Sequence, residues 1–293
     1  MDAPRTFYLG CAVWAYKEWV GDLFPSGSRA NDLLRLYSRR LTTVEGNTTF
    51  YATPKEETVL RWRSETPDDF RFCLKLPQEV SHSGPLAERL AETQRFCERM
   101  ALLGDRLGPY FLQLPPNYHP RQIGDLARWL DAWPRELPLA VEVRHIDWYA
   151  PANEAALMEL LALYKAGRVV MDVRPLNLGD LPGAEQDLRR ARDNKPDVPM
   201  HPLRSGGIAL VRYIGHPDVP RNADLLDEWA ERVAQWIAEG TQVFFFMHCP
   251  VEARSPDLCR ELQRRLDGRP GIPALPWNEL GDEGAGMTQT TLF

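Results

Sequence analysis

Eight short apolar runs alternate with amphipathic stretches along almost the whole chain of 293 residues. Each run has the length of a β-strand, and each stretch repeats its apolar residues with the period of an α-helix. Eight strands separated by helices predict a (β/α)8 barrel, or TIM barrel, as a single domain over residues 1–278. A doubly wound open sheet is the alternative. It is less favoured because no Gly-rich dinucleotide fingerprint follows the first strand.

The predicted elements follow from this alternation. The strands are Phe7–Cys11, Thr42–Asn47, Phe70–Leu76, Tyr110–Leu114, Leu139–Arg144, Arg168–Arg174, Ile208–Tyr213 and Gln242–His248. The helices are Leu33–Leu41, Lys55–Ser64, Leu86–Leu103, Gln122–Trp133, Glu154–Lys165, Ala223–Ala238 and Asp257–Leu266. Only the segment 175–207, which is rich in Pro, Gly, Asp and Arg, departs from the rhythm. We expect it to be an irregular insertion with a short helix near Ala184–Arg192.

Polar side chains gather near the carboxyl ends of these strands. Side chains alternate across a strand, so Thr43, Glu45 and Asn47 share one face of their strand. Catalytic residues of TIM barrels come from the carboxyl ends of several strands. We therefore expect one polar mouth, formed by Glu45, Asn47, Lys75, Gln113, Glu142, Arg144, Asp172, Arg212 and His248.

Three of these side chains are the candidate catalytic residues. Two carboxyls in unlike environments can hold different protonation states, so Glu45 and Glu142 are an expected acid/base pair. Lys75 is the third candidate, because a buried lysine can act as a nucleophile. The alternative is a structural network in which Glu142 pairs with Arg144 or Lys75.

The remaining polar residues suit an anionic substrate that carries phosphate or carboxylate. Guanidinium groups bind such oxygens bidentately, and lysine adds a compact charge. Alternatively, these cations neutralise the acids of the mouth itself. The expected substrate-binding residues are Asn47, Tyr51, His82, Gln113, Arg144, Asp172, Arg212 and His248.

A metal cofactor is the less favoured reading of the same residues. Imidazole and carboxylate groups accept divalent ions, and the residues of these types are His82, Glu142, Asp172, His216 and His248. No HxH or HExxH spacing supports a metal site, and neighbouring cations oppose one. We therefore assign no metal ligand and leave the cofactor open. The chain has no Walker loop and no G-x-S-x-G elbow, which argues against nucleophilic serine chemistry.

Composition excludes several partners and compartments. The net charge of −6 and the pI of about 5.6 give no basic field that would attract membranes or long nucleic acids. Five cysteines without zinc or redox spacing are expected to be reduced packing residues. No apolar stretch resembles a signal peptide or reaches the length of a membrane span. We expect a cytoplasmic protein.

The last residues form a separate feature. Residues 279–293 are Gly-rich and acidic at their start, which predicts a flexible tail. Gln289, Leu292 and Phe293 resemble the Gln-x-x-Leu-Phe peptide with which bacterial DNA enzymes dock on the DNA sliding clamp. In such a peptide the two apolar side chains fill a pocket and the amide fixes orientation. The alternative is an incidental tail.

Several motifs resemble the YecE-like proteins, also called domain of unknown function seventy-two. They are Val44-Glu45-x-Asn47-x-Thr49-Phe50-Tyr51, Phe70-x-Phe72-x-x-Lys75-x-Pro77, Gln113-Leu114-Pro115-Pro116 and Val141-Glu142-x-Arg144. The resemblance reaches to about Leu266 and implies a TIM barrel, without an assigned reaction. The family's Gly-Thr-Ser-Gly-Trp is replaced here by Gly10-Cys11-Ala12-Val13-Trp14, which indicates a divergent member.

Three functions remain open from the sequence. The first is an enzyme, of the hydrolase class, that acts on a phosphate-containing substrate, with nucleic acid as that substrate if the tail delivers the protein to DNA. The second is a non-catalytic module that binds a nucleic acid or a metabolite. The third is a sugar isomerase or an aldolase-like enzyme, for which the fold and Lys75 are the reasons.

Overall fold

The eight predicted strands are all present in the computed structural model, which describes residues 5–279, and each end lies within two residues of its predicted position. The strands are β1 (Phe7–Cys11), β2 (Thr43–Gly46), β3 (Arg71–Leu74), β4 (Tyr110–Gln113), β5 (Leu139–Glu142), β6 (Gly167–Asp172), β7 (Ile208–Ile214) and β8 (Gln242–His248).

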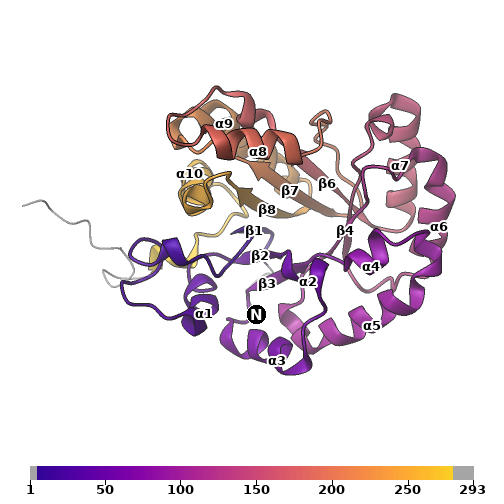
Figure 1. Cartoon of the computed structure of the whole chain (residues 1–293), viewed down its shortest axis with the longest axis horizontal. Helices are drawn as coiled ribbons and strands as arrows, with labels where there is room; N and C mark the ends of the chain where they lie inside the picture. The colour runs from indigo at the N-terminus through magenta and orange to yellow at the C-terminus, as the bar shows by residue number, and fades with distance from the viewer. Residues whose placement is uncertain (1–4, 280–293) are drawn as a thin grey trace, which may run out of the picture.

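The strands form one parallel sheet that curls into a nearly closed barrel (Figure 1). Their order is β3-β2-β1-β8-β7-β6-β5-β4, so β1 pairs with β8 and the two ends of the sheet are β3 and β4. Two backbone bonds join these ends: Gly108 N–H donates to Phe72 O at 2.9 Å, and Leu76 N–H donates to Phe111 O at 2.9 Å. The predicted TIM barrel is confirmed.

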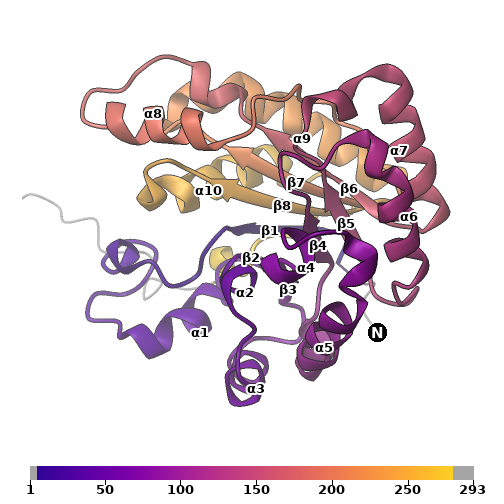
Figure 2. The same cartoon turned by 45° about the vertical axis from the view of Figure 1, so that its right-hand side comes forward.

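Helices surround the sheet (Figures 1 and 2). They are α1 (Leu33–Tyr37), α2 (Thr48–Tyr51), α3 (Glu56–Glu65), α4 (Gln78–Ser81), α5 (Leu90–Met100), α6 (Ile123–Asp131), α7 (Pro151–Leu163), α8 (Glu185–Asn194), α9 (Ala223–Ala238) and α10 (Ser255–Leu266). The short helices α2 and α4 follow β2 and β3 and were not predicted. The predicted helix Leu86–Leu103 is shorter as α5, with separate 3-10 turns on both sides, and Gly104 has a φ of 56° that no helix accommodates.

Two apolar layers fill the two sides of the sheet. Alternate strand residues point outward and pack under the helices, as Leu9, Val44 and Phe245 do. The others point inward and fill the barrel with Tyr8, Cys73, Phe111, Ala140, Val169, Leu210, Phe244 and Phe246. The barrel is therefore a packed core, as in other TIM barrels, and the carboxyl ends of the strands are where inward-facing polar groups can meet a ligand.

The insertion 175–207 contains helix α8, as predicted, and α8 lies on the side of α9 and α10 (Figure 2). Leu188 of α8 is buried and packs with Met171 of β6, Leu176 and Ile214 of β7. Met171 and Ile214 lie at the carboxyl ends of their strands, so α8 is anchored over that end of the barrel.

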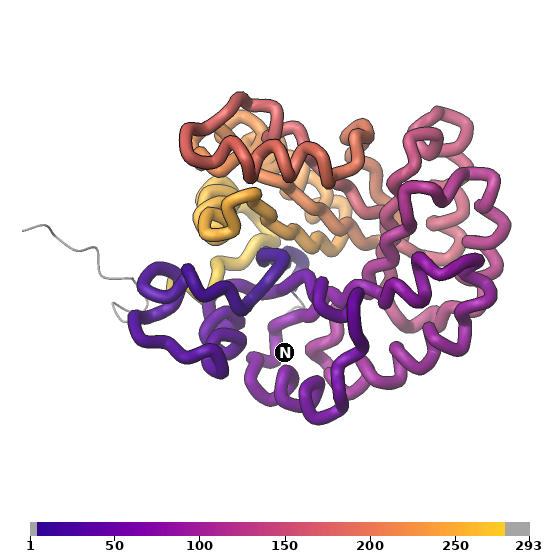
Figure 3. The backbone as a smooth tube through the Cα atoms, viewed as in Figure 1, coloured from indigo at the N-terminus to yellow at the C-terminus, as the bar shows by residue number. Residues whose placement is uncertain are grey.

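The described chain begins and ends side by side. Figure 3 shows the indigo start next to the yellow end, in agreement with the pairing of β1 with β8. The five cysteines are free and buried. No helix within residues 5–279 is long and apolar enough to cross a membrane. The predicted clamp-binding residues Gln289, Leu292 and Phe293 lie outside the described residues.

Candidate active site at the barrel mouth

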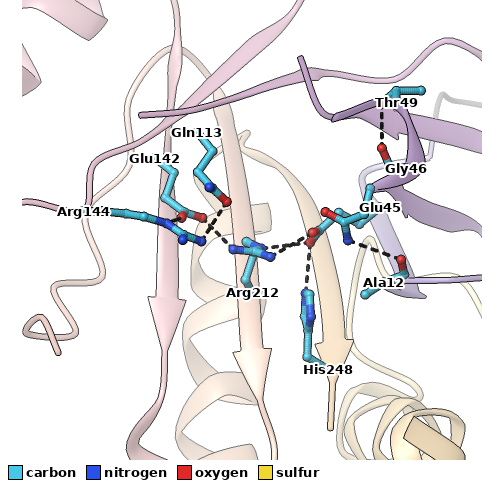
Figure 4. Close-up of polar contacts among 10 residues, drawn as sticks. Ala12, Glu45, Gly46, Thr49, Gln113, Glu142, Arg144, Arg212 and His248 are labelled. Carbon is cyan, nitrogen blue, oxygen red and sulfur yellow. Dashed lines mark hydrogen bonds and ion pairs between the residues drawn. The ribbon is translucent and has the colours of Figure 1, made fainter. Parts of the chain in front are cut away.

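Arg212 is the centre of the polar mouth (Figure 4). It lies on β7, and its guanidinium donates to both carboxylate oxygens of Glu45 at 2.9 Å. Its third nitrogen donates to Glu142 Oε2 at 2.8 Å. All three side chains are almost fully buried. One arginine therefore joins two carboxylates that are 97 residues apart in the sequence, in the fork geometry that makes such pairs strong.

The network extends to both sides of this triad. His248 Nε2 lies 3.0 Å from Glu45 Oε2. On the other side, Arg144 donates to Glu142 Oε1 and to Gln113 Oε1, the latter at 2.7 Å. The expected convergence of distant strands on one mouth is thus present for the side chains of β2, β4, β5, β7 and β8.

Both carboxylates of the triad are ionised. Burial alone would raise the pKa of Glu45, but Arg212 and His248 hold it well below its usual range. Burial is likewise outweighed at Glu142, where Arg144 and Arg212 lower the pKa to about 2. The expected acid/base pair requires Glu45 and Glu142 to hold different protonation states, whereas both are ionised here. Shared arginine contacts make the two carboxylates alike.

Lys75 is a cation at the mouth that pairs with neither carboxylate of the triad. It is 7% exposed, and its ammonium makes no hydrogen bond or ion pair with the residues of the described chain. Its Nζ lies 4.0 Å from the centre of the Phe50 ring, a cation–π contact. Burial and the nearby Arg212 charge lower the pKa of Lys75 to about 8. Its amine can therefore exchange a proton near neutral pH.

Lys195 is a second such cation, and sequence reasoning did not find it. It directly follows α8, and burial together with the charge of Arg212 lowers its pKa to about 8. The charges of Glu45 and Glu142 also act on its pKa, which indicates that its amine lies near these carboxylates. Within residues 5–279, its ammonium has no hydrogen bond or ion pair.

Glu252 is a further mouth residue that the sequence did not reveal. It begins the 3-10 turn Glu252–Arg254 after β8, and the Trp19 indole donates to its carbonyl at 3.2 Å. Its Oε1 is buried and has no hydrogen-bond partner in the described part of the chain. Burial raises the pKa of its carboxyl to about 7, and the nearby Ser255 side chain and the charge of Lys195 act in the opposite direction. Its place just beyond the carboxyl end of a strand is the signal that could have found it.

Three expected substrate-binding residues lie at the rim. Asn47 donates to Ala12 O at 3.4 Å and so is held toward the loop after β1. Tyr51 on α2 and His82 after α4 are both exposed. Partial burial and the charges of Lys75 and Arg144 lower the pKa of His82 to about 4, so its imidazole is neutral at physiological pH.

Asp172 is a correction to the predicted mouth. Its neighbour Val170 belongs to the outer core, and side chains two apart on a strand share a face. The Asp172 carboxylate accepts from the Trp229 indole of α9 at 2.8 Å and from Arg174. It therefore lies under the helices and anchors α9 to β6, away from the mouth.

The five candidate metal ligands from the sequence do not form a cluster among residues 5–279. His216, for example, contacts Gly179 O and the Asp218 N–H in a loop. Among residues 5–279, the three side chains within reach of one shared ion are instead His119, His145 and Asp147.

That His–His–Asp cluster has a structural explanation. The Nδ1 atoms of His119 and His145 accept the backbone N–H groups of Arg121 and Asp147, which caps two 3-10 turns. His119 Nε2 lies 2.8 Å from Asp147 Oδ2. An imidazole whose Nδ1 accepts a hydrogen bond carries its proton on Nε2. A metal would have to displace either the proton or the cap, so the cluster is explained without one.

The family model described as "Protein of unknown function DUF72" matches residues 8–280, which include the whole barrel and its mouth. The chain belongs to the DUF72 family. This confirms the resemblance to YecE-like proteins. The family description assigns no reaction, so function has to be argued from the residues of the mouth.

Relatives and solved structures agree with this membership. UPF0759 protein YecE of Escherichia coli K12 is 37% identical over 275 residues, which are 92% of this chain and 97% of YecE. UPF0759 protein YunF of Bacillus subtilis is 22% identical over 89% of this chain and 94% of YunF. The crystal structure of a DUF72 family protein from Thermotoga maritima has a TM-score of 0.65 at 20% identity, and covers 88% of this chain and 97% of that one. This last likeness supports the fold alone.

Proposed function

We propose that the barrel mouth binds an anionic substrate through a phosphate or carboxylate group and acts on it as an enzyme. The observation that carries this proposal is the pair Lys75 and Lys195, whose ammonium groups have no partner among residues 5–279, while each carboxylate of the triad is already held by arginine. Four positive and two negative groups meet here: Lys75, Arg144, Lys195 and Arg212 against Glu45 and Glu142.

The remaining titratable groups do not cancel this excess. Burial lowers the pKa of His248 to about 4, as partial burial does for His82, so both imidazoles are neutral at pH 7. Glu252, with its pKa raised to about 7, is only partly ionised there. The chain as a whole carries a net charge of −6. Attraction of an anion is therefore local, at the point where the lysines face the mouth.

Lys75 also supplies a reason to expect catalysis rather than binding alone. An amine with a pKa of about 8 is partly unprotonated at neutral pH and can take or give a proton, or act as a nucleophile. The triad of Glu45, Arg212 and Glu142 then holds the surrounding strands in position. A non-catalytic binding module is the alternative. Turnover of phosphate esters that is lost in Lys75→Met would favour the enzyme, whereas binding without any chemical change would favour the module.

We expect inorganic phosphate to bind to the mouth, and Lys75→Met or Lys195→Met to weaken this binding by about tenfold or more each. Charge-assisted hydrogen bonds contribute about 1.5–3 kcal/mol, and a tenfold change in affinity is ~1.4 kcal/mol. Methionine keeps the length of the side chain and removes its charge. Isothermal titration at constant ionic strength, with chloride replacing phosphate in the reference, measures the effect.

Lys165→Met is the matched control, because Lys165 precedes β6 and so lies at the opposite end of the barrel. It should leave phosphate binding unchanged. Wild-type protein that takes up no phosphate at concentrations of tens of millimolar, or that loses binding equally in all three variants, would contradict the proposal.

We also propose that the C-terminal peptide binds the DNA sliding clamp, on the sequence evidence of Gln289, Leu292 and Phe293, which lie outside the described residues. Full-length protein should bind purified clamp in a surface-based binding assay. The double change Leu292→Ala and Phe293→Ala should remove the signal, because the two apolar anchors are lost. Thr290→Ala with Thr291→Ala is the control. Wild-type protein without measurable binding would rule this partner out.

A further inference from the structure

Three rings form a continuous aromatic rim on one side of the mouth: Phe50, Tyr51 and His82. Phe50 and Tyr51 belong to α2 after β2, and His82 follows α4 after β3. The Phe50 ring lies 5.2 Å from the Tyr51 ring and 5.0 Å from the His82 ring, and both contacts are edge-to-face. Two separate loops thus present their rings as one surface beside Lys75.

Tyr51 is the exposed end of this rim. At 74% exposure, it is the most exposed large hydrophobic side chain among the described residues for which exposure is known. A single exposed ring is common and needs no explanation. This one, however, contacts Phe50, and the Lys75 ammonium lies 4.0 Å from the centre of the same Phe50 ring. The exposed Tyr51 ring and the Lys75 ammonium therefore contact the same phenyl group.

His82 adds a polar group to the rim. Its Nδ1 lies 2.7 Å from Ser81 Oγ. Its Nε2 has no hydrogen-bond partner in the part of the chain that the structure describes. The neutral imidazole can therefore hydrogen-bond a ligand without adding a charge.

We propose that the aromatic rim binds the base of a nucleotide whose phosphate lies against Lys75 and Lys195. This inference deepens the proposed function, on which it rests, by naming the class of substrate. The phosphate and base of a nucleoside monophosphate are separated by one sugar, and Lys75 and Tyr51 both contact the single ring of Phe50. Every base has a face that stacks on an aromatic side chain, whereas a sugar phosphate has none.

Charge argues for a single nucleotide unit rather than a long polymer. Strong binding of nucleic acid depends on many phosphate contacts with basic residues, but this chain has a net charge of −6. Two lysines at the mouth, Lys75 and Lys195, have no hydrogen bond or ion pair within residues 5–279. The ligand is therefore either a free mononucleotide or the phosphorylated terminal nucleotide of a single strand. The two sources share the same chemistry, and the test below separates them.

The test compares adenosine monophosphate, ribose 5-phosphate and inorganic phosphate by isothermal titration on the full chain. We expect adenosine monophosphate to bind about tenfold more tightly than ribose 5-phosphate, because only the nucleotide stacks on Tyr51. Tyr51→Ala should abolish this difference and leave the affinity for ribose 5-phosphate unchanged. Tyr51→Phe should keep the difference, since the ring is retained. Leu163→Ala, which removes an exposed apolar side chain at the end of α7, is the control.

Each outcome decides a separate point. Equal affinities for adenosine monophosphate and ribose 5-phosphate would overturn the nucleotide inference and leave the proposed anion site intact. No binding of any of the three ligands would overturn the proposed function as well. A tenfold preference that survives Tyr51→Ala would also refute the stacking role. If the inference holds, a competition experiment with a 5′-phosphorylated oligonucleotide identifies the source of the nucleotide. Competition as strong as that of adenosine monophosphate means that the site takes the end of a strand. No competition means that it takes the free nucleotide.

Discussion

Replacing Arg212 with methionine is expected to lower the free energy of unfolding by about 3–5 kcal/mol at pH 7. The change removes the common partner of Glu45 and Glu142, both of which are almost completely buried. His248 and Arg144 would remain, each beside only one of the two carboxylates. A buried carboxylate that loses its partner keeps the cost of desolvation and loses the attraction that offsets it. Urea denaturation of both proteins measures the difference.

The pH dependence of this difference has a definite sign. In the wild type, the pKa of Glu45 and that of Glu142 lie below the ordinary value of about 4.3. Groups with a lowered native pKa contribute stability that is present above pH 4.3 and is lost as the pH falls through the native pKa, which is about 2 for Glu142. Without Arg212, burial should raise both pKa values, so the variant should gain stability as the pH falls from 7 to 5. The loss relative to wild type should therefore shrink at pH 5.

Arg35→Met is the control for this experiment, because Arg35 pairs with Asp32 on the surface, where both side chains are 41% exposed. Exposed pairs contribute about 0–1 kcal/mol. A loss for Arg212→Met no larger than for this control would mean that the triad does not hold the strands together, and a loss that stays constant from pH 7 to pH 5 would refute the electrostatic explanation.

The sequence was sufficient to predict the strands because each is short, apolar and bounded by polar turns. In β2, β5 and β7, alternation also predicts which side chains face inward, so Glu45, Glu142 and Arg212 were placed correctly at the mouth. The residues directly before them in the sequence, Val44, Val141 and Val211, are apolar and pack on the opposite face. A strand with one clear apolar face reveals the direction of its polar side chains.

β6 shows where this reasoning stops. Val169 faces the barrel interior and Val170 faces the helices, so both faces of β6 are apolar. A strand buried on both sides has no alternation to indicate direction, and Asp172 was assigned to the wrong face. The partner that explains Asp172 is Trp229, 57 residues away on α9. No local pattern reveals a contact of this kind.

Lys195 was missed for a different reason. It lies in an irregular segment rich in proline and aspartate, where a single lysine carries no periodic signal. Its position depends on α8, which is anchored through Leu188 to Met171 and Ile214. Only the tertiary packing of the insertion brings this lysine to the mouth.

Replacing Glu252 with glutamine is expected to stabilise the protein by about 3 kcal/mol at pH 8. Burial raises the pKa of this carboxyl to about 7, and its Oε1 is buried without a hydrogen-bond partner among residues 5–279. At pH 8 the native protein therefore carries a carboxylate that water solvates better in the unfolded chain. Glutamine keeps the shape of the side chain and cannot ionise, so the cost of burying the charge disappears.

The sign of the pH effect distinguishes this explanation from others. A carboxyl with a raised native pKa destabilises the fold progressively as the pH rises from about 4.3, the unfolded value, to about 7, the native value. Glu252→Gln should thus match the wild type near pH 4 and exceed it increasingly up to pH 8, as measured by urea denaturation across this range. Glu159→Gln, an exposed site on α7, should show no such trend. If Glu252→Gln is instead destabilising at pH 8, the carboxylate is ionised and held by Lys195, and that lysine would then no longer be free for a substrate anion.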